Sequence, residues 1–173
     1  MREAAGTAGA GALDRPRLLA APPGLAAPGS ASATFWRAFS LAELPLGALR
    51  RFSVGDLDIL IAHTSRGLLA TDDRCPHMAV PLSLGTLEGC VVACPLHEGR
   101  FDLATGEPVQ FPSTGGLDAL GMPHAPKPAP ESVPRPAVRE IVARAQAATR
   151  VRRLRYYPLR IVDGWLGVGV PAA

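Results

Sequence analysis

Two short stretches, residues 75–77 (CPH) and residues 94–97 (CPLH), decide how this sequence is read. Each stretch holds one cysteine and one histidine, and sixteen residues separate the first stretch from the second. Thiolates and imidazoles are both metal ligands, and the order Cys-x-His followed by Cys-x-x-His supplies two of each. The spacing therefore predicts a metal centre built from Cys75, His77, Cys94 and His97.

Two kinds of metal centre use two cysteines and two histidines. Structural zinc sites usually pair like with like, as Cys-x₂₋₄-Cys and His-x₃₋₅-His. Here each stretch mixes a cysteine with a histidine, which favours an iron–sulfur cluster. With both imidazoles on one iron, that iron has fewer negative ligands, so its reduced state is easier to reach. A structural zinc module stays open as the minor alternative.

The sequence around these stretches predicts many short strands. Gly55-Asp56 and Asp163-Gly164 each separate two β-prone runs, which is the pattern of a tight β-hairpin. Apolar residues alternate along 57–62, so at least one face of that strand is expected to be apolar. Short strands with turns between them predict an all-β fold, a sandwich or a small barrel.

Two segments fall outside this β pattern. Residues 1–33 are mainly Ala, Gly, Pro, Ser and Leu without periodicity, which predicts a disordered arm before a domain at 34–173. Residues 113–136 are rich in proline, and 136–150 have apolar residues at helical spacing after a first-turn proline. We therefore expect a Pro-rich and helical insertion at about 113–153, between two halves of the β domain.

With these features in view, the sequence resembles the Rieske-type [2Fe–2S] ferredoxins and the Rieske ferredoxin-like subunits. The resemblance runs from about residue 35 to residue 110 and resumes over 154–170. Besides the four candidate ligands, it rests on Pro81-Leu82, Gly85, Phe101-Asp102-Leu103 and Thr105-Gly106.

This resemblance implies an antiparallel β-sandwich with a small cluster-binding subdomain, which we place at about 73–112. It implies one Rieske-type [2Fe–2S] cluster per chain. It also implies that Cys75 and Cys94 hold the buried iron, while His77 and His97 hold the outer iron near solvent. An electron partner would dock at that outer edge.

The sequence departs from the high-potential Rieske proteins of respiratory and photosynthetic complexes. Those proteins carry a second cysteine in each loop and join the two by a disulfide, whereas Val80 and Leu96 stand at these places here. We expect no disulfide and a reduction potential in the lower part of the Rieske range. Ala79 and Glu98 stand where the family commonly has glycine, so a requirement for positive φ would remodel the loops.

Composition limits the class of protein. With 173 residues, 47% of them hydrophobic, the chain can form one ordinary core. Three cysteines cannot make a fully paired disulfide framework, and the sequence contains neither a run of membrane-spanning length nor a secretory leader. We therefore expect a cytoplasmic location. Eight arginines face one glutamate in 134–160, but without a nucleic-acid motif we expect no nucleic-acid partner.

These expectations combine into an electron carrier that takes one electron from a reductase and passes it to a terminal oxygenase or another redox enzyme. We expect no catalytic residues, because an oxygenase would need a further mononuclear iron site, and only His63 and His124 remain as histidines. The main alternative is a Rieske subunit held tightly in a larger oxidoreductase. The residues expected to dock the redox partner are Met78, Leu96, Arg150, Arg152, Arg153 and Arg155.

Overall fold

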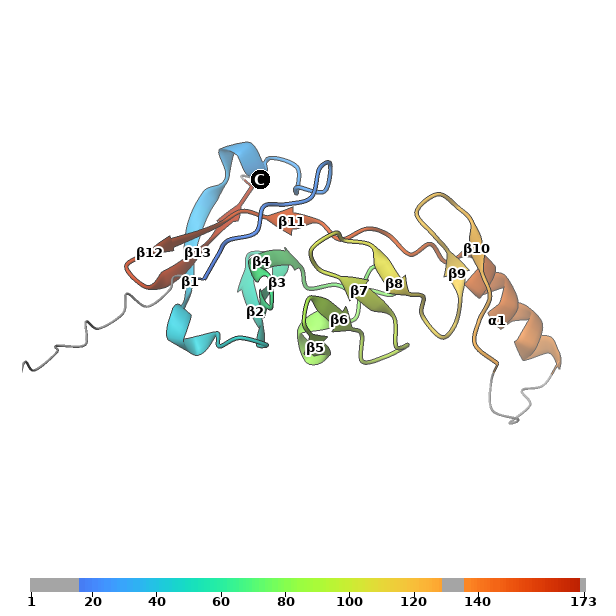
Figure 1. Cartoon of the computed structure of the whole chain (residues 1–173). Coiled ribbons are helices and arrows are strands. Elements are labelled where there is room, and N and C mark those ends of the chain that lie inside the picture. Colours follow the sequence, from blue (N-terminus) through green and yellow to red (C-terminus); the bar gives the residue numbers. More distant parts are fainter. Residues whose placement is uncertain (1–15, 129–135, 172–173) are drawn as a thin grey trace, which may run out of the picture.

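The computed structural model describes residues 16–128 and 136–171, which are mainly antiparallel strands (Figure 1). The central sheet, in the order β11-β4-β3-β2, consists of β2 (Leu49–Val54), β3 (Leu57–Thr64), β4 (Gly67–Asp72) and β11 (Tyr156–Tyr157). The outer sheet, β1-β13-β12, consists of β1 (Thr34–Ser40), β12 (Leu159–Val162) and β13 (Trp165–Val170). The small sheet, β5-β6-β7-β8, consists of β5 (Thr86–Glu88), β6 (Val91–Ala93), β7 (Arg100–Asp102) and β8 (Pro108–Gln110). The predicted all-β class is thereby confirmed.

The β3–β4 hairpin is buried on both faces. The alternation along 57–62 predicted at least one apolar face and did not predict that the second face is also buried. Ile59 and Ile61 face the outer sheet and share a core with Leu166. Leu60 and Ala62, on the opposite face of the same strand, belong to a second core that includes residues of the small sheet. Strands buried on both sides need apolar residues at every position, and this hairpin therefore joins the two cores.

Both predicted turns are confirmed. Residues 55–56 join β2 to β3, and Asp163-Gly164 join β12 to β13. Asp163 has φ 49° and Gly164 has φ 77°, and two successive positive φ values are what a type I′ hairpin turn requires.

The insertion lies at the end of the molecule opposite the outer sheet (Figure 1). It contains the strands β9 (Gly116–Leu117) and β10 (Pro123–His124) and the helix α1 (Pro136–Ala148), which confirms the predicted helix. Leu117 donates its N–H to Thr149 O and accepts from Val151 N–H, both at 2.8 Å. These bonds form a neck that brings the two ends of the insertion together. The helices within the described ranges are too short or too polar to cross a bilayer.

Residues 16–33 are ordered, contrary to the expectation of a disordered arm. Leu68 donates its N–H to Arg17 O, and Leu19 donates to Leu68 O, both at 2.8 Å, so the segment lies beside β4. Gly67 permits this approach, because a Cβ there would lie 2.3 Å from Arg17 O. Further along, Ala27 donates to Tyr156 O of β11 and is itself buried. Residues 1–15 lie outside the described part.

Asp73, directly after β4, is a fully buried carboxylate that holds the start of the loop leading to Cys75. It accepts hydrogen bonds from Arg51 Nε (2.6 Å), from Ser83 N–H (2.7 Å) and from the Ser83 hydroxyl (2.6 Å). Ser83 belongs to the 3₁₀ turn η3 (Leu82–Leu84), so the carboxylate ties the central sheet to the chain that follows the loop.

Replacing Asp73 by alanine is therefore expected to lower the free energy of unfolding by about 3 kcal/mol, because it leaves the half-buried N–H and hydroxyl of Ser83 and part of the Arg51 guanidinium without an acceptor. Ser83→Ala removes only one of the three bonds and should cost about 1 kcal/mol. Urea unfolding of the purified protein measures both. Equal losses for the two variants would contradict this role of Asp73.

Candidate metal centre

The four candidate ligands lie on two loops that share one backbone design. The first loop follows β4, and the second joins β6 to β7. In the first, Cys75 donates its N–H to Val80 O (2.7 Å); in the second, Cys94 donates to Gly99 O (2.8 Å). Each loop is thus closed by a bond from the cysteine N–H to the carbonyl five residues later, and it holds its histidine between these ends.

A left-handed residue stands at the same place in both loops. Ala79 has φ 57° and Glu98 has φ 58°, each four residues after its cysteine. The two positions do require positive φ, and here alanine and glutamate adopt it in place of glycine. Left-handed backbone costs a residue with a Cβ roughly 1–2 kcal/mol, so both loops store strain. Part of it is offset at Glu98, whose carboxylate pairs with Lys127 Nζ at 2.8 Å.

The loops bring the four side chains together as a pair of sulfurs and a pair of rings. Cys75 and Cys94 are free thiols, each 4% exposed, within the core shared with the small sheet. The rings of His77 and His97 lie with centroids 4.9 Å apart and planes at 84°. The Nδ1 atoms of both rings are buried without a hydrogen-bond partner. Buried polar atoms are normally satisfied, so these two nitrogens point to a missing ligand.

The electrostatics favour the ligating form at two of the four side chains, the thiolate of Cys94 and the neutral ring of His77. A hydrogen bond shared with Cys75 lowers the pKa of the Cys94 thiol to about 6, and that bond together with burial raises the pKa of Cys75. Burial and the neighbouring His97 lower the pKa of His77, which keeps that ring neutral near pH 7. Metals bind thiolates and neutral imidazoles, so the donor set fits a centre with two sulfur and two nitrogen ligands.

Among the described residues, no three His, Cys, Asp or Glu side chains are grouped to hold one metal ion. A two-iron cluster does not need three protein ligands on one metal, because each iron takes only two protein ligands and the sulfides of the cluster supply the rest. A cysteine pair beside a histidine pair is the arrangement that such a cluster needs.

A basic groove of about 660 Å³ runs beside the first loop, between that loop and the chain that returns from the insertion. Arg155 pairs with Asp72 (2.7 Å), and Arg153 pairs with Glu107. Within the described ranges, Arg150 and Arg152 have no carboxylate within salt-bridge distance. The arginines lining the groove are Arg74, Arg150, Arg152, Arg153 and Arg155, against the single acid Asp72.

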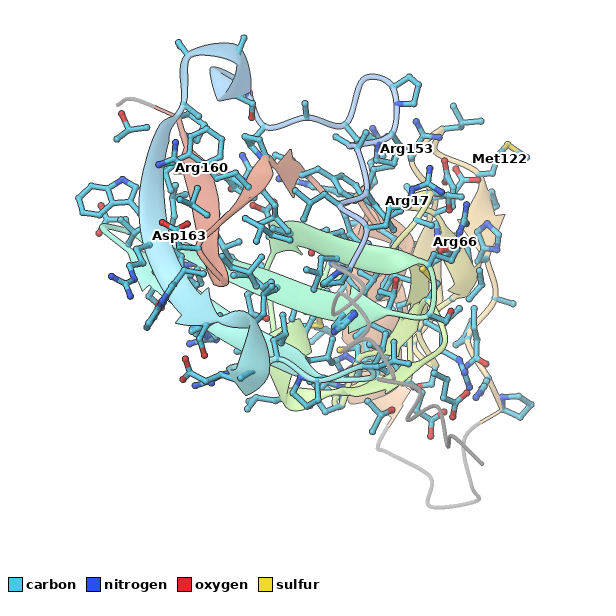
Figure 2. All side chains as sticks on the ribbon, turned by 60° about the vertical axis from the view of Figure 1, so that its left-hand side comes forward. Arg17, Arg66, Met122, Arg153, Arg160 and Asp163 are labelled. Atoms are coloured by element: carbon cyan, nitrogen blue, oxygen red, sulfur yellow. The ribbon has the colours of Figure 1, made fainter. Side chains whose placement is uncertain are left out.

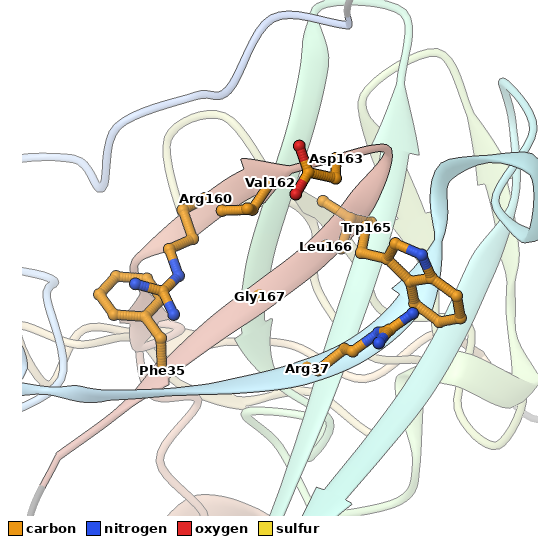
Figure 3. A pocket seen from close by; sticks show the side chains of 8 residues that line it. All are labelled: Phe35, Arg37, Arg160, Val162, Asp163, Trp165, Leu166 and Gly167. Carbon is orange, nitrogen blue, oxygen red and sulfur yellow. The ribbon is translucent and has the colours of Figure 1, made fainter.

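A second pocket, of about 370 Å³, lies on the outer sheet (Figure 3). Its floor is Gly167, which pairs with Arg37 on one side and Arg160 on the other. Arg37 stacks 3.4 Å from the Trp165 ring, while Arg160 stacks on Phe35. Figure 2 shows Arg160 to the left and Arg153 to the right, and the two pockets share no lining residue, so this pocket is separate from the basic groove.

The third cysteine and the other two histidines lie outside the centre, as expected from their spacing in the sequence. His63 is in β3, with Nδ1 2.9 Å from Leu44 O, and Cys90 is half-buried in the turn between β5 and β6. His124 stacks on Phe111 with ring centroids 3.4 Å apart. Sequence reasoning missed Thr114, whose hydroxyl oxygen lies 3.2 Å from His77 Nε2. Nothing in the sequence pattern could have found this contact, since 37 positions separate the two residues.

Comparison of the sequence with known proteins shows its family. The sequence model of the Rieske [2Fe-2S] domain matches residues 35–122. The ferredoxin component of the naphthalene 1,2-dioxygenase system of Pseudomonas aeruginosa is 38% identical over 80 residues, which cover 46% of this chain and 77% of the relative. The anthranilate 1,2-dioxygenase ferredoxin subunit of Burkholderia cepacia is 31% identical over 134 residues, covering 73% of this chain and 90% of the relative.

Solved structures support the fold. The ferredoxin of carbazole 1,9a-dioxygenase from Nocardioides aromaticivorans IC177 superposes with a TM-score of 0.51 at 21% identity. The match covers 81% of this chain and the whole of that ferredoxin. At this identity the likeness shows a common fold.

Replacing Ala79 by glycine is expected to raise the free energy of unfolding by about 0.5–1 kcal/mol, because relief of the left-handed strain exceeds the added freedom of the unfolded chain. Glu98→Gly should gain less, since it also loses the contact with Lys127. Ala79→Val should be destabilising. Urea unfolding would refute the strain argument if Ala79→Gly were the less stable protein.

Proposed function

The chain belongs to the Rieske [2Fe–2S] domain family, and on that premise we propose that Cys75, His77, Cys94 and His97 hold its cluster. The observation that carries this assignment is the pair of buried Nδ1 atoms without partners, beside two buried thiols. Cys75 and Cys94 would bind the inner iron, since both lie in the core. His77 and His97, both half-buried, would bind the outer iron through Nδ1.

The protein is an electron carrier with a Rieske-type [2Fe–2S] cluster, and it is not an enzyme by itself. Its relatives are ferredoxin components of dioxygenase systems, so its redox partners are a reductase and a terminal oxygenase. The cluster supplies the one-electron chemistry. The chain holds the cluster, excludes water from the sulfur side and offers the histidine side to a partner.

We also propose the division of the chain into a cluster-binding subdomain at about 73–112 and an insertion at about 113–153. The first is supported by a core that includes Cys75, Cys94 and Phe101. The cytoplasm is our proposed location, because three free cysteines suit a reducing compartment.

The partner is proposed to dock at the histidine edge, where Met78 and Leu96 are both more than half exposed. Apolar side chains in such a place exclude water when a partner covers them. The basic groove adjoins Met78, and Arg150 and Arg152 are its guanidiniums without carboxylate partners in the described chain. We therefore propose that the partner presents acidic groups beside its own electron entry site.

A second candidate is a Rieske subunit held permanently in a larger oxidoreductase. The insertion favours it, because Leu120, Met122 and Ile141 are each at least 60% exposed. Exposed apolar side chains gathered on one added segment are typical of a contact surface. Size-exclusion chromatography of the protein from its native cell separates the two candidates, since a stable complex would elute with its partner.

The ligand assignment predicts two irons per chain and a rhombic Rieske-type EPR signal after reduction with dithionite. Cys94→Ser and His97→Ala are each expected to abolish the signal and reduce the iron content. Cys90→Ser and His63→Ala, which change the same residue types outside the centre, should leave both unchanged. One zinc per chain without an EPR signal would establish the zinc module and refute the cluster.

The docking proposal predicts that charge reversal at the groove changes the rate at which the reduced protein passes its electron to an acceptor. Reduced protein would be mixed with ferricyanide, an anionic oxidant, and the loss of the reduced spectrum followed by stopped flow. The double variant Arg150→Glu/Arg152→Glu is expected to react about tenfold more slowly at low ionic strength, with the difference shrinking as salt is added.

The matched control is Arg37→Glu/Arg160→Glu, which changes the net charge equally on the outer sheet. It should slow the reaction much less. Equal rates for the two double variants would mean that only net charge matters and would refute docking at the groove. An unchanged EPR signal in each variant shows that the cluster itself is intact.

A further inference from the structure

The segment that enters and leaves the insertion contacts both cluster loops. Ser113 donates its N–H to His97 O of the second loop at 2.7 Å. Arg152, on the returning chain, donates its N–H to Pro76 O of the first loop at 3.1 Å. Thr114 places its hydroxyl oxygen 3.2 Å from His77 Nε2. The two ends of the insertion thus contact both loops through backbone hydrogen bonds, and Thr114 also contacts the ring of His77.

We infer that Thr114 is a positioning residue for His77, and this inference rests on the proposed ligand assignment. If Nδ1 of His77 binds iron, the proton of the neutral ring must be on Nε2. The Nε2–H then donates to the Thr114 hydroxyl oxygen. Such a bond fixes the ring orientation and makes the imidazole a stronger donor to the metal.

The backbone around Thr114 is built to hold it in place. Gly115 follows with φ 70°, and its N–H donates to Pro112 O at 2.8 Å. A Cβ at Gly115 would lie 2.5 Å from His124 O, so a larger residue would displace the turn. Lys127 closes it from the other side by donating its N–H to Ser113 O at 2.9 Å. The hydroxyl is therefore presented by a rigid turn.

Because of this contact, the two imidazoles differ in the hydrogen-bond partners of their Nε2 atoms. In the described chain, His97 Nε2 has no hydrogen-bonding side chain, whereas His77 Nε2 has Thr114. The loops also lack a disulfide, because all three cysteines are free. The contacts of Ser113, Thr114 and Arg152 therefore tether the loops to the ends of the insertion.

The test compares Thr114→Val with Thr114→Ser in the cluster-loaded full chain. Valine keeps the shape of the threonine side chain and removes the hydroxyl oxygen that accepts the hydrogen bond from His77 Nε2. We expect its reduction potential to rise, because a weaker imidazole donor stabilises the oxidised iron less. We also expect iron release to a chelator to be about tenfold faster. The serine variant, which restores the hydroxyl, should return both values toward those of the parent protein.

Thr149→Val is the matched control, since that hydroxyl donates to Ala145 O within the insertion and, among the described residues, makes no hydrogen bond to either loop. It should change neither the potential nor iron release. A Thr114→Val protein identical to the parent in both would overturn the inference, and so would a serine variant that behaves like valine. Failure of the ligand assignment is distinguishable, because the parent protein itself would then lack the two-iron EPR signal.

Discussion

The burial of the β3–β4 hairpin on both faces is the constraint on which the rest of the structure depends. Ile59 and Ile61 bind the outer sheet to one side, and Leu60 and Ala62 bind the cysteine-bearing core to the other. Apolar burial contributes roughly 25 cal/mol per Å², and here a single strand contributes to both cores at once. The cluster loops are therefore attached directly to the most buried part of the fold.

The two loops show how the proposed redox site is positioned by backbone geometry. Both close with a bond from a cysteine N–H to a carbonyl five residues later, and both require a left-handed residue just before that carbonyl. Side-chain hydrogen bonds then fix the positions of the loops and of one histidine. Asp73 fixes the entry of the first loop, and the turn at Gly115 fixes Thr114 beside its histidine.

Much of this arrangement could be predicted from the sequence, because its signals are local. The spacing of the cysteines and histidines predicted the candidate ligands, Asp163-Gly164 predicted a hairpin, and Pro136 with its apolar stripe predicted the helix. The ordering of residues 16–33 could not be predicted, because part of their attachment is through backbone bonds, which any sequence can make. Their apolar side chains, such as Leu19, Leu25 and Ala27, pack on the two cores without a periodic pattern in the sequence. The roles of Asp73 and Thr114 were equally hidden, since their partners are distant along the chain.

The neck formed by Leu117 with Thr149 and Val151 has a consequence for the evolution of this sequence. The two chain segments of the neck lie side by side, so the chain beyond the neck, which carries α1, starts and ends at nearly one point. Lengthening or exchanging that segment leaves the spacing of the neck, and hence of Ser113 and Arg152, as it was. Natural variation in that segment can therefore leave the contacts of Ser113 and Arg152 with the two loops unchanged.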